Sequence, residues 1–264
     1  MIKDITLGQY FPGESIIHRT DPRVKIVLAI VLMVTILTIE SYAAFLLFAG
    51  FSFAAVGLSK IPVKYALKGL KPLLFIVAFA AVINIFFTPG TPIFKFKYIS
   101  ITAEGLDLAA KMVLRLSLLV ISTSLMTLTT TPIALTDGIE RLFEPLKRVK
   151  IPVHEFAMMM TIALRFIPTL LEETDKIMKA QASRGADFDS GNMIQRAKSF
   201  IPILVPLFIS AFRRADELAD AMNARCYRGG VGRTRMNELS FSKSDVLVSS
   251  VVLIFELLII ILHL

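Results

Sequence analysis

Hydrophobic positions along this chain gather into long apolar runs in its first half and at its end, with amphipathic segments between. Five runs predict membrane-spanning helices, at 26–39, 43–58, 72–89, 106–128 and 244–264. The first two are near the lower limit for crossing about 30 Å of hydrocarbon at about 1.5 Å per residue. We interpret them as two short spans joined by a tight outer turn, and a single long bent helix is the alternative.

The segments between the runs predict the orientation. Four lysines fall within one short loop, and lysine-rich loops stay on the cytoplasmic side: Lys60, Lys64, Lys68 and Lys71. This places the N-terminus in the cytoplasm. Residues 1–23 contain Pro-Gly and Asp-Pro turn signals, which favour a structured but non-helical lead-in. Residues 93–102 alternate at period two after a Pro-Gly pair, which predicts a β-hairpin on the outer face.

Residues 129–243 are amphipathic and rich in charge, which predicts a cytoplasmic helical region. Thr131 and Pro132 suit a helix start, as N-cap and first helical residue, for a short helix to 149. A long helix at 152–185 contains Pro168, where we expect a kink. A third helix, capped by Asp189 or Ser190, runs to about Tyr227.

The sequence therefore predicts an all-α integral membrane protein with about five transmembrane helices, long cytoplasmic helices and a small outer β-hairpin. We divide it into a cytoplasmic lead-in (1–23), transmembrane helices 1–4 (24–128), a cytoplasmic helical domain (129–243) and a C-terminal transmembrane helix (244–264). Composition agrees, because 55% of the 264 residues are apolar and the mean hydropathy is +0.69.

The sequence does not support several other kinds of functional site. The sequence has no G-x-x-x-x-G-K-[ST] phosphate loop, so energy from ATP must come from another chain. Three histidines far apart in sequence give no metal-binding spacing. The only cysteine, Cys226, excludes an intramolecular disulfide. The net charge of +8 would also fit a nucleic-acid-binding module, but the basic residues are interleaved with acidic ones and apolar runs.

The two long polar helices end in a repeated pattern. At an offset of 41 residues, Asp175 aligns with Asp216 and Arg184 with Arg225. One interpretation is a simple helix stop, because a cation suits the terminal carbonyls and Gly185 can adopt the left-handed conformation. The other is that each guanidinium extends beyond the helix and binds a partner carboxylate. The recurring aspartate favours the second interpretation.

Three charged residues lie inside predicted spans, where an unpaired charge is costly: Lys111, Arg115 and Glu256. Counted along the helices, Arg115 lies about 15 Å and Glu256 about 12 Å from the outer face. The similar depths predict an intramembrane ion pair between Arg115 and Glu256. Two alternatives remain. The basic side chains extend to the interface while Glu256 is protonated, or Glu256 acts as a proton relay.

Residues 181–188 (Gln-Ala-Ser-Arg-Gly-Ala-Asp-Phe) and 223–230 (Asn-Ala-Arg-Cys-Tyr-Arg-Gly-Gly) resemble the paired Ala-Arg-Gly signatures of the T component of energy-coupling factor transporters. The lead-in, with Gly-Gln-Tyr-Phe-Pro-Gly at 8–13 and His-Arg-Thr-Asp-Pro-Arg at 18–23, is also similar to that family's start. The sequence departs from the family at Ser183, where alanine is common, and at Cys226, where glycine is common. The second departure puts the turn role of the glycine in question.

The resemblance implies a non-catalytic membrane scaffold of a bacterial ATP-driven vitamin or micronutrient importer, in the cell membrane. Two ABC ATPase subunits, which would hold ATP and Mg, each receive one coupling helix, and an S component that binds the substrate rests on the apolar surface of these helices. This chain would bind no cofactor of its own. The residues that would dock the ATPases are Ser183, Arg184, Gly185, Ala224, Arg225, Cys226 and Arg228.

The main alternative is a self-sufficient secondary transporter. Such a protein needs inverted repeats or paired half-helices at the membrane midplane, whereas the repeat here is parallel and lies in the polar half. A membrane-anchored nucleic-acid module using 225–235 is a further alternative. The identity of the vitamin would reside in the S component, and the sequence of this chain does not give it.

Overall fold

The computed structural model describes residues 10–96, 99–186, 188, 192, 194, 198–229 and 239–263. They belong to two compact units. The first, here called the membrane unit, comprises Gly8–Leu142 and Leu239–Leu264. The second, here called the helix-pair unit, contains Phe143–Glu238.

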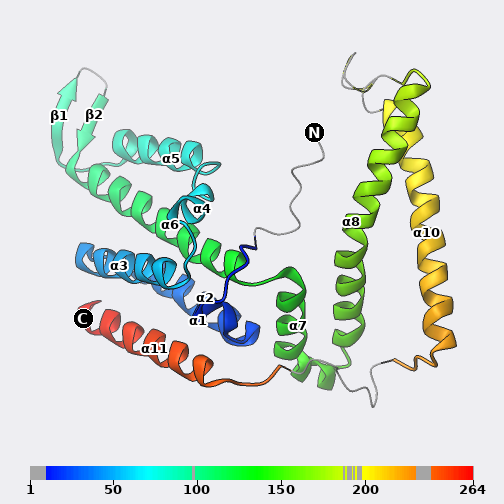
Figure 1. The fold of residues 1–264 in the computed structure, drawn as a ribbon. Coiled ribbons are helices and arrows are strands. Elements are labelled where there is room, and N and C mark those ends of the chain that lie inside the picture. The colour runs from blue at the N-terminus through cyan, green and yellow to red at the C-terminus, as the bar shows by residue number, and fades with distance from the viewer. Residues whose placement is uncertain are drawn as a thin grey trace. The chain divides into compact units, whose positions relative to one another are not determined.

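The membrane unit is built almost entirely from helices (Figure 1). In chain order they are α1 (Ile16–Arg19), α2 (Pro22–Thr38), α3 (Tyr42–Leu58), α4 (Val63–Lys68), α5 (Leu74–Phe87), α6 (Ala103–Thr129), α7 (Pro132–Leu142) and α11 (Lys243–His263). Between α5 and α6 lies the predicted hairpin, in which β1 (Pro92–Phe96) pairs antiparallel with β2 (Ile99–Thr102). An all-α membrane protein with a small β-hairpin is therefore confirmed.

Local capping explains where these helices start. Asp21 accepts a hydrogen bond from the Arg23 amide at the start of α2, where Pro22 occupies the first turn. The Thr131 hydroxyl accepts from the Ala134 amide at the start of α7, as predicted. Between Thr38 and Tyr42 the chain leaves the helical conformation, so α2 and α3 are two helices and the single bent helix is wrong.

Contacts at the helix ends show that α6 runs antiparallel to α2 and α5, and that α11 runs in the same direction as α2. Lys25, near the start of α2, donates to the carbonyl of Thr129, the last residue of α6. The amide of Asp21 donates to Asp245, in the first turn of α11. At the opposite end, the Thr102 hydroxyl donates to the Thr88 carbonyl after α5. We call the end that carries Asp21, Lys25, Thr129 and Asp245 the polar end.

Two apolar clusters form the core of the membrane unit. The larger one joins α2, α3, α6 and α11 through Ile36, Ile39, Ala44, Phe45, Phe48, Leu118, Phe255 and Ile259. The smaller one lies nearer the polar end and joins α3, α4 and α6 through Val56, Ile61, Ala66, Ile121 and Leu128. In lipid, such clusters hold helices together by close van der Waals packing rather than by removal of apolar surface from water.

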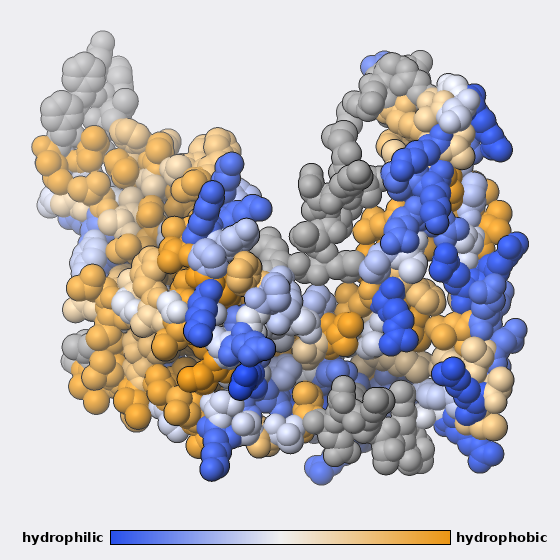
Figure 2. All heavy atoms as spheres, in the orientation of Figure 1, coloured by the Kyte–Doolittle hydropathy of each residue, from blue (hydrophilic) through white to orange (hydrophobic). Residues whose placement is uncertain are grey.

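Much of the remaining apolar surface faces outward. Leu46, Phe75 and Phe87 are 77%, 79% and 80% exposed, and hydrophobic side chains cover most of the membrane unit in Figure 2. Such a surface suits lipid rather than water. By length and composition α6 and α11 are long and apolar enough to cross a membrane, and α3 and α5 are shorter apolar helices.

The structure differs from the sequence-based expectation at several helices. The lead-in contains one helical turn, α1, because the Ser15 hydroxyl accepts the His18 amide. The lysine-rich loop contains α4. The helix expected to reach 149 ends at Leu142 and continues as the 3₁₀ helix η1 (Glu144–Val149), with Lys150 in the left-handed conformation. The expected caps Asp189 and Ser190 lie outside the described residues.

Among its described residues the helix-pair unit contains η1, α8 (Val153–Ser183) and α10 (Ile201–Ala224), with α8 and α10 side by side (Figure 1). They run antiparallel. Near the end of α8, the Gln181 amide group donates to the Pro202 carbonyl at the start of α10 (3.4 Å). At the other end, the Tyr227 hydroxyl lies 3.3 Å from Nε2 of His154.

Candidate functional site

The end of α8 has the backbone geometry that ends many helices. Arg184 is the C-cap, and Gly185 has a φ of +89°. The amides of Gly185 and Ala186 donate to the carbonyls of Ala182 and Gln181 (2.9 and 3.0 Å). This is the Schellman arrangement, in which the left-handed residue lets two backbone amides satisfy the last free carbonyls.

The end of α10 has the same arrangement. Arg225 is the C-cap, and the amides of Cys226 and Tyr227 donate to the carbonyls of Asn223 and Met222 (2.9 and 3.0 Å). Cys226 adopts a φ of +55°, although it has a side chain. Cys226 therefore fills the turn role that glycine commonly has at this position of the family signature. The conformation costs an L-residue about 1–2 kcal/mol.

Because backbone amides satisfy the terminal carbonyls, neither arginine side chain is needed to cap its helix. Arg184, Arg225 and the following Arg228 are exposed, and no ion pair involves them within the described part of the chain. Gly185, Ala224 and Cys226 are exposed beside them. Ser183 is also exposed, but its hydroxyl donates back to the Lys179 carbonyl. The guanidinium groups of these arginines are thus accessible to another molecule.

The antiparallel packing places the two arginines at opposite ends of one helix pair. A bridge between the helices fixes their alignment: Arg214 of α10 forms an ion pair with Glu173 of α8 (3.0 Å). Each of these residues precedes its own helix's arginine by 11 positions. At about 1.5 Å per residue, the bridge lies about 16 Å from each helix end, and the two ends are about 33 Å apart.

Glu173 has a second partner, the Ser210 hydroxyl, which also donates to its carboxylate. The hydrogen bond from Ser210 lowers the pKa of Glu173, burial partly opposes this, and the hydrogen bond and charge of Arg214 lower the pKa further. Glu173 is therefore ionised at neutral pH. The sequence pattern did not reveal this bridge, because the pairing depends on how α8 and α10 pack.

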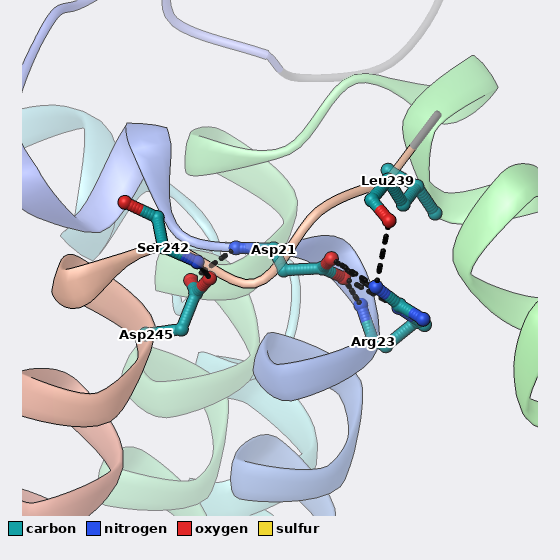
Figure 3. A network of polar contacts seen from close by, with 5 residues as sticks. All are labelled: Asp21, Arg23, Leu239, Ser242 and Asp245. Atoms are coloured by element: carbon teal, nitrogen blue, oxygen red, sulfur yellow. Dashed lines mark hydrogen bonds and ion pairs between the residues drawn. The ribbon is translucent and has the colours of Figure 1, made fainter. Parts of the chain in front are cut away.

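A second polar network, also missed from the sequence, holds the polar end of the membrane unit (Figure 3). Asp245 accepts the amides of Asp21 (2.7 Å) and Ser242 (2.6 Å), which ties the start of α11 to the start of α2. Arg23 donates to the Asp21 carboxylate and to the Leu239 carbonyl. The Ser-x-x-Asp spacing at 242–245 is the available sequence signal, since an acidic residue three positions after an N-cap serine can accept the backbone amide of that serine.

Burial alone would raise the pKa of Asp21, but the hydrogen bonds and charge of Arg23 outweigh it and hold that pKa below its ordinary value. The neighbouring Lys25 is only 8% exposed. Its ammonium group donates to the carbonyls of His18 and Thr129 and to the Thr130 hydroxyl, so all three of its protons are used. The lead-in, α2 and the end of α6 are therefore held together at one point.

The predicted partners Arg115 and Glu256 lie in the larger core region but bind different groups. Arg115 donates to the Ile39 carbonyl (2.7 Å), and Glu256 accepts from the Thr35 hydroxyl. No ion pair within 4.0 Å joins Arg115 to Glu256 in the described structure. The Arg115 Nε and one Glu256 oxygen are buried without a hydrogen-bond partner there. Since Ile39 is one turn beyond Thr35 on α2, both side chains converge on the same segment. Lys111 instead pairs with Asp107 (2.7 Å).

Known proteins resemble this chain over nearly its whole length. Residues 13–237 match the family described as CbiQ, cobalt transport protein. A relative from Ruminiclostridium cellulolyticum, named Energy-coupling factor transporter transmembrane protein EcfT, is 63% identical over 255 residues, which cover 97% of this chain and 96% of the relative. Relatives of the same name from Clostridium kluyveri and Bacillus subtilis are 56% and 46% identical over 251 and 256 residues. These alignments cover 94% and 96% of this chain, and 93% and 97% of the respective relatives.

The family match covers far more than half of the chain, and it includes both arginine-bearing helix ends as well as residues 13–23 of the lead-in. The relatives extend that match into α11, which carries the Asp245 end of the polar network. The chain therefore belongs to the family of transmembrane T components of energy-coupling factor transporters.

Proposed function

We propose that this chain couples two ABC ATPase subunits to a membrane-embedded S component in an importer of vitamins or related micronutrients. The observation that carries the proposal is the pair of matched helix ends, each presenting an exposed arginine at an opposite end of the helix pair. Two separated docking points suit a motor of two subunits. ATP and Mg would be held by those subunits, and this chain would remain non-catalytic.

The S component would rest on the apolar face of α10. One side of this helix carries exposed apolar side chains at helical spacing: Ile201, Leu204, Val205, Phe208 and Phe212. Ile203, which is 2% exposed, points to the opposite side. An exposed stripe of this kind marks a contact surface for another apolar partner.

The docking test uses the full transporter complex with the variants Arg184→Ala, Arg225→Ala and both together. We expect each single variant to weaken ATPase binding by about 2–5 kcal/mol, because a partner carboxylate is left unpaired in the contact. Arg165→Ala and Arg213→Ala are matched controls, since both arginines are exposed on the same helices away from the ends. Co-purification of the ATPases and ATP-driven uptake are measured. Normal values for both in the double variant would contradict the proposal.

The S-component contact is tested separately with Phe208→Ser and Phe212→Ser. We expect loss of S-component co-purification with the ATPases still bound. ATP-independent uptake by the isolated chain would instead indicate a secondary transporter.

A further inference from the structure

The lysines between α3 and α5 form an exposed basic surface that the proposed function does not use. The lysine surface consists of Lys60, Lys64, Lys68 and Lys71, all of them exposed. No ion pair involves any of the four in the described part of the chain, whereas Lys111, Lys147 and Lys179 each have a carboxylate partner. The sequence contains no acidic residue between Glu40 and Glu104.

Packing of α4 determines the direction of two of these lysines. Ala66 is 2% exposed and belongs to the apolar cluster with Ile121 and Leu128 of α6. Lys64 and Lys68 precede and follow Ala66 by two residues, which rotates each about 160° around the helix axis from it. Both lysines therefore point away from the core. The Tyr65 ring contacts Phe11 at 5.5 Å between centroids, which fixes this orientation further.

Exposed apolar side chains flank the lysine surface on both sides along the chain. Leu58 at the end of α3 is 67% exposed, and Phe75 at the start of α5 is 79% exposed. Figure 2 shows hydrophilic side chains projecting near α4 from a largely hydrophobic surface. Tyr65 lies between Leu58 and Phe75 in the chain and is 47% exposed, and tyrosine is common at the boundary between hydrocarbon and water.

We propose that the lysine surface binds the headgroups of anionic phospholipids in the surrounding bilayer. The ammonium groups of Lys64 and Lys68 would contact lipid phosphates, and Leu58 and Phe75 would lie against the acyl chains. Lysine binds phosphate as a point charge, and each lysine near an anionic membrane surface contributes an attraction worth roughly a fivefold change in affinity. Charge complementarity favours lipid as the occupant, because no acidic group of the described chain neutralises these lysines.

The test uses the full-length chain in detergent micelles containing phosphatidylglycerol or phosphatidylcholine. Retained lipid is measured by native mass spectrometry, and thermal unfolding is followed in the same samples. We expect Lys64→Gln/Lys68→Gln to retain phosphatidylglycerol roughly 25-fold more weakly than the unmodified chain, with phosphatidylcholine unaffected. Lys64→Arg/Lys68→Arg should keep the preference. The control Lys176→Gln/Lys198→Gln removes two exposed lysines of the helix-pair unit and should also keep it.

If the double variant does not accumulate, the single variants Lys64→Gln and Lys68→Gln are measured in the same way, and each should lose roughly fivefold in retention. Unchanged phosphatidylglycerol retention in these variants would overturn the inference, as would an equal loss in the control. Loss of ATPase or S-component binding with lipid retention intact would show that the surface serves a protein partner, and it too would overturn the inference.

Discussion

Replacing Cys226 with glycine should strengthen the end of α10. Cys226 has a φ of +55°, in the left-handed region, and its amide and that of Tyr227 make the two hydrogen bonds that end the helix. An L-residue loses about 1–2 kcal/mol in this conformation. Glycine avoids that cost but loses about 0.5–1 kcal/mol more backbone entropy on folding. The difference is a net gain of about 0.5–1 kcal/mol for Cys226→Gly.

The reciprocal change at the end of α8 should weaken it. Gly185 has a φ of +89°, further from the left-handed minimum near +57°. A Cβ added there meets no atom within 4 Å. The cost of Gly185→Cys is therefore a backbone cost alone, about 1–2 kcal/mol for the left-handed conformation. Cysteine recovers about 0.5–1 kcal/mol of backbone entropy relative to glycine, so the net cost is about 0.5–1 kcal/mol.

Hydrogen exchange of the two amides that close each helix end measures both effects. Cys226→Gly should slow exchange at residues 226 and 227 about two- to fivefold, and Gly185→Cys should speed exchange at residues 185 and 186 by about the same factor. Cys226→Ser keeps a side chain on the residue in the left-handed conformation but removes the thiol, and its exchange should match that of the unmodified chain. Faster exchange in Cys226→Gly, with Cys226→Ser unchanged, would refute the conformational argument.

Three further predictions concern polar contacts between elements. Asp245→Asn should destabilise the membrane unit by about 1–2 kcal/mol in thermal unfolding, because an amide oxygen can replace only one of the two carboxylate oxygens that accept the Asp21 and Ser242 amides; unfolding like the unmodified chain would contradict this. Lys25→Met should cost about 3 kcal/mol, because two buried acceptors and one partly buried acceptor lose their donor, and Lys198→Met serves as the surface control. Because the pKa of Glu173 is lowered, its ionised carboxylate stabilises the contact between α8 and α10 at any pH above 4.5, the ordinary pKa of glutamate. This stabilisation is lost as the pH falls through the lowered pKa. Hydrogen exchange of α10 should accelerate over that acidic range, and Glu173→Gln should abolish the acceleration.

The long apolar runs predicted most helices of the membrane unit closely. The run at 43–58 became Tyr42–Leu58, and the run at 106–128 became Ala103–Thr129. In lipid, backbone amides and carbonyls have no water to bind, so an apolar segment must satisfy them internally by forming a helix. Hydropathy alone therefore predicts helices in this part of the chain. The hairpin was predictable for a different reason, since its alternating pattern follows a Pro-Gly pair.

Other features depend on tertiary contacts that the sequence pattern does not contain. The helix α4 is six residues long, too short to be stable alone, and it forms where Ala66 packs against α6. Arg115 lies at a depth similar to that of Glu256, yet it binds the Ile39 carbonyl, because α2 ends within its reach. Depth along a helix does not specify which neighbouring helix a side chain faces.

The repeat at an offset of 41 residues illustrates the same limit at the candidate site. In sequence the two arginine-bearing ends are equivalent and point the same way along the chain. Antiparallel packing turns them in opposite directions, so one binding surface of one small partner cannot receive both ends. The Glu173–Arg214 bridge lies midway between them, 11 residues from each arginine. A displacement applied at one end would therefore be transmitted through a fixed contact to the other, as the proposed coupling of two ATPase subunits requires.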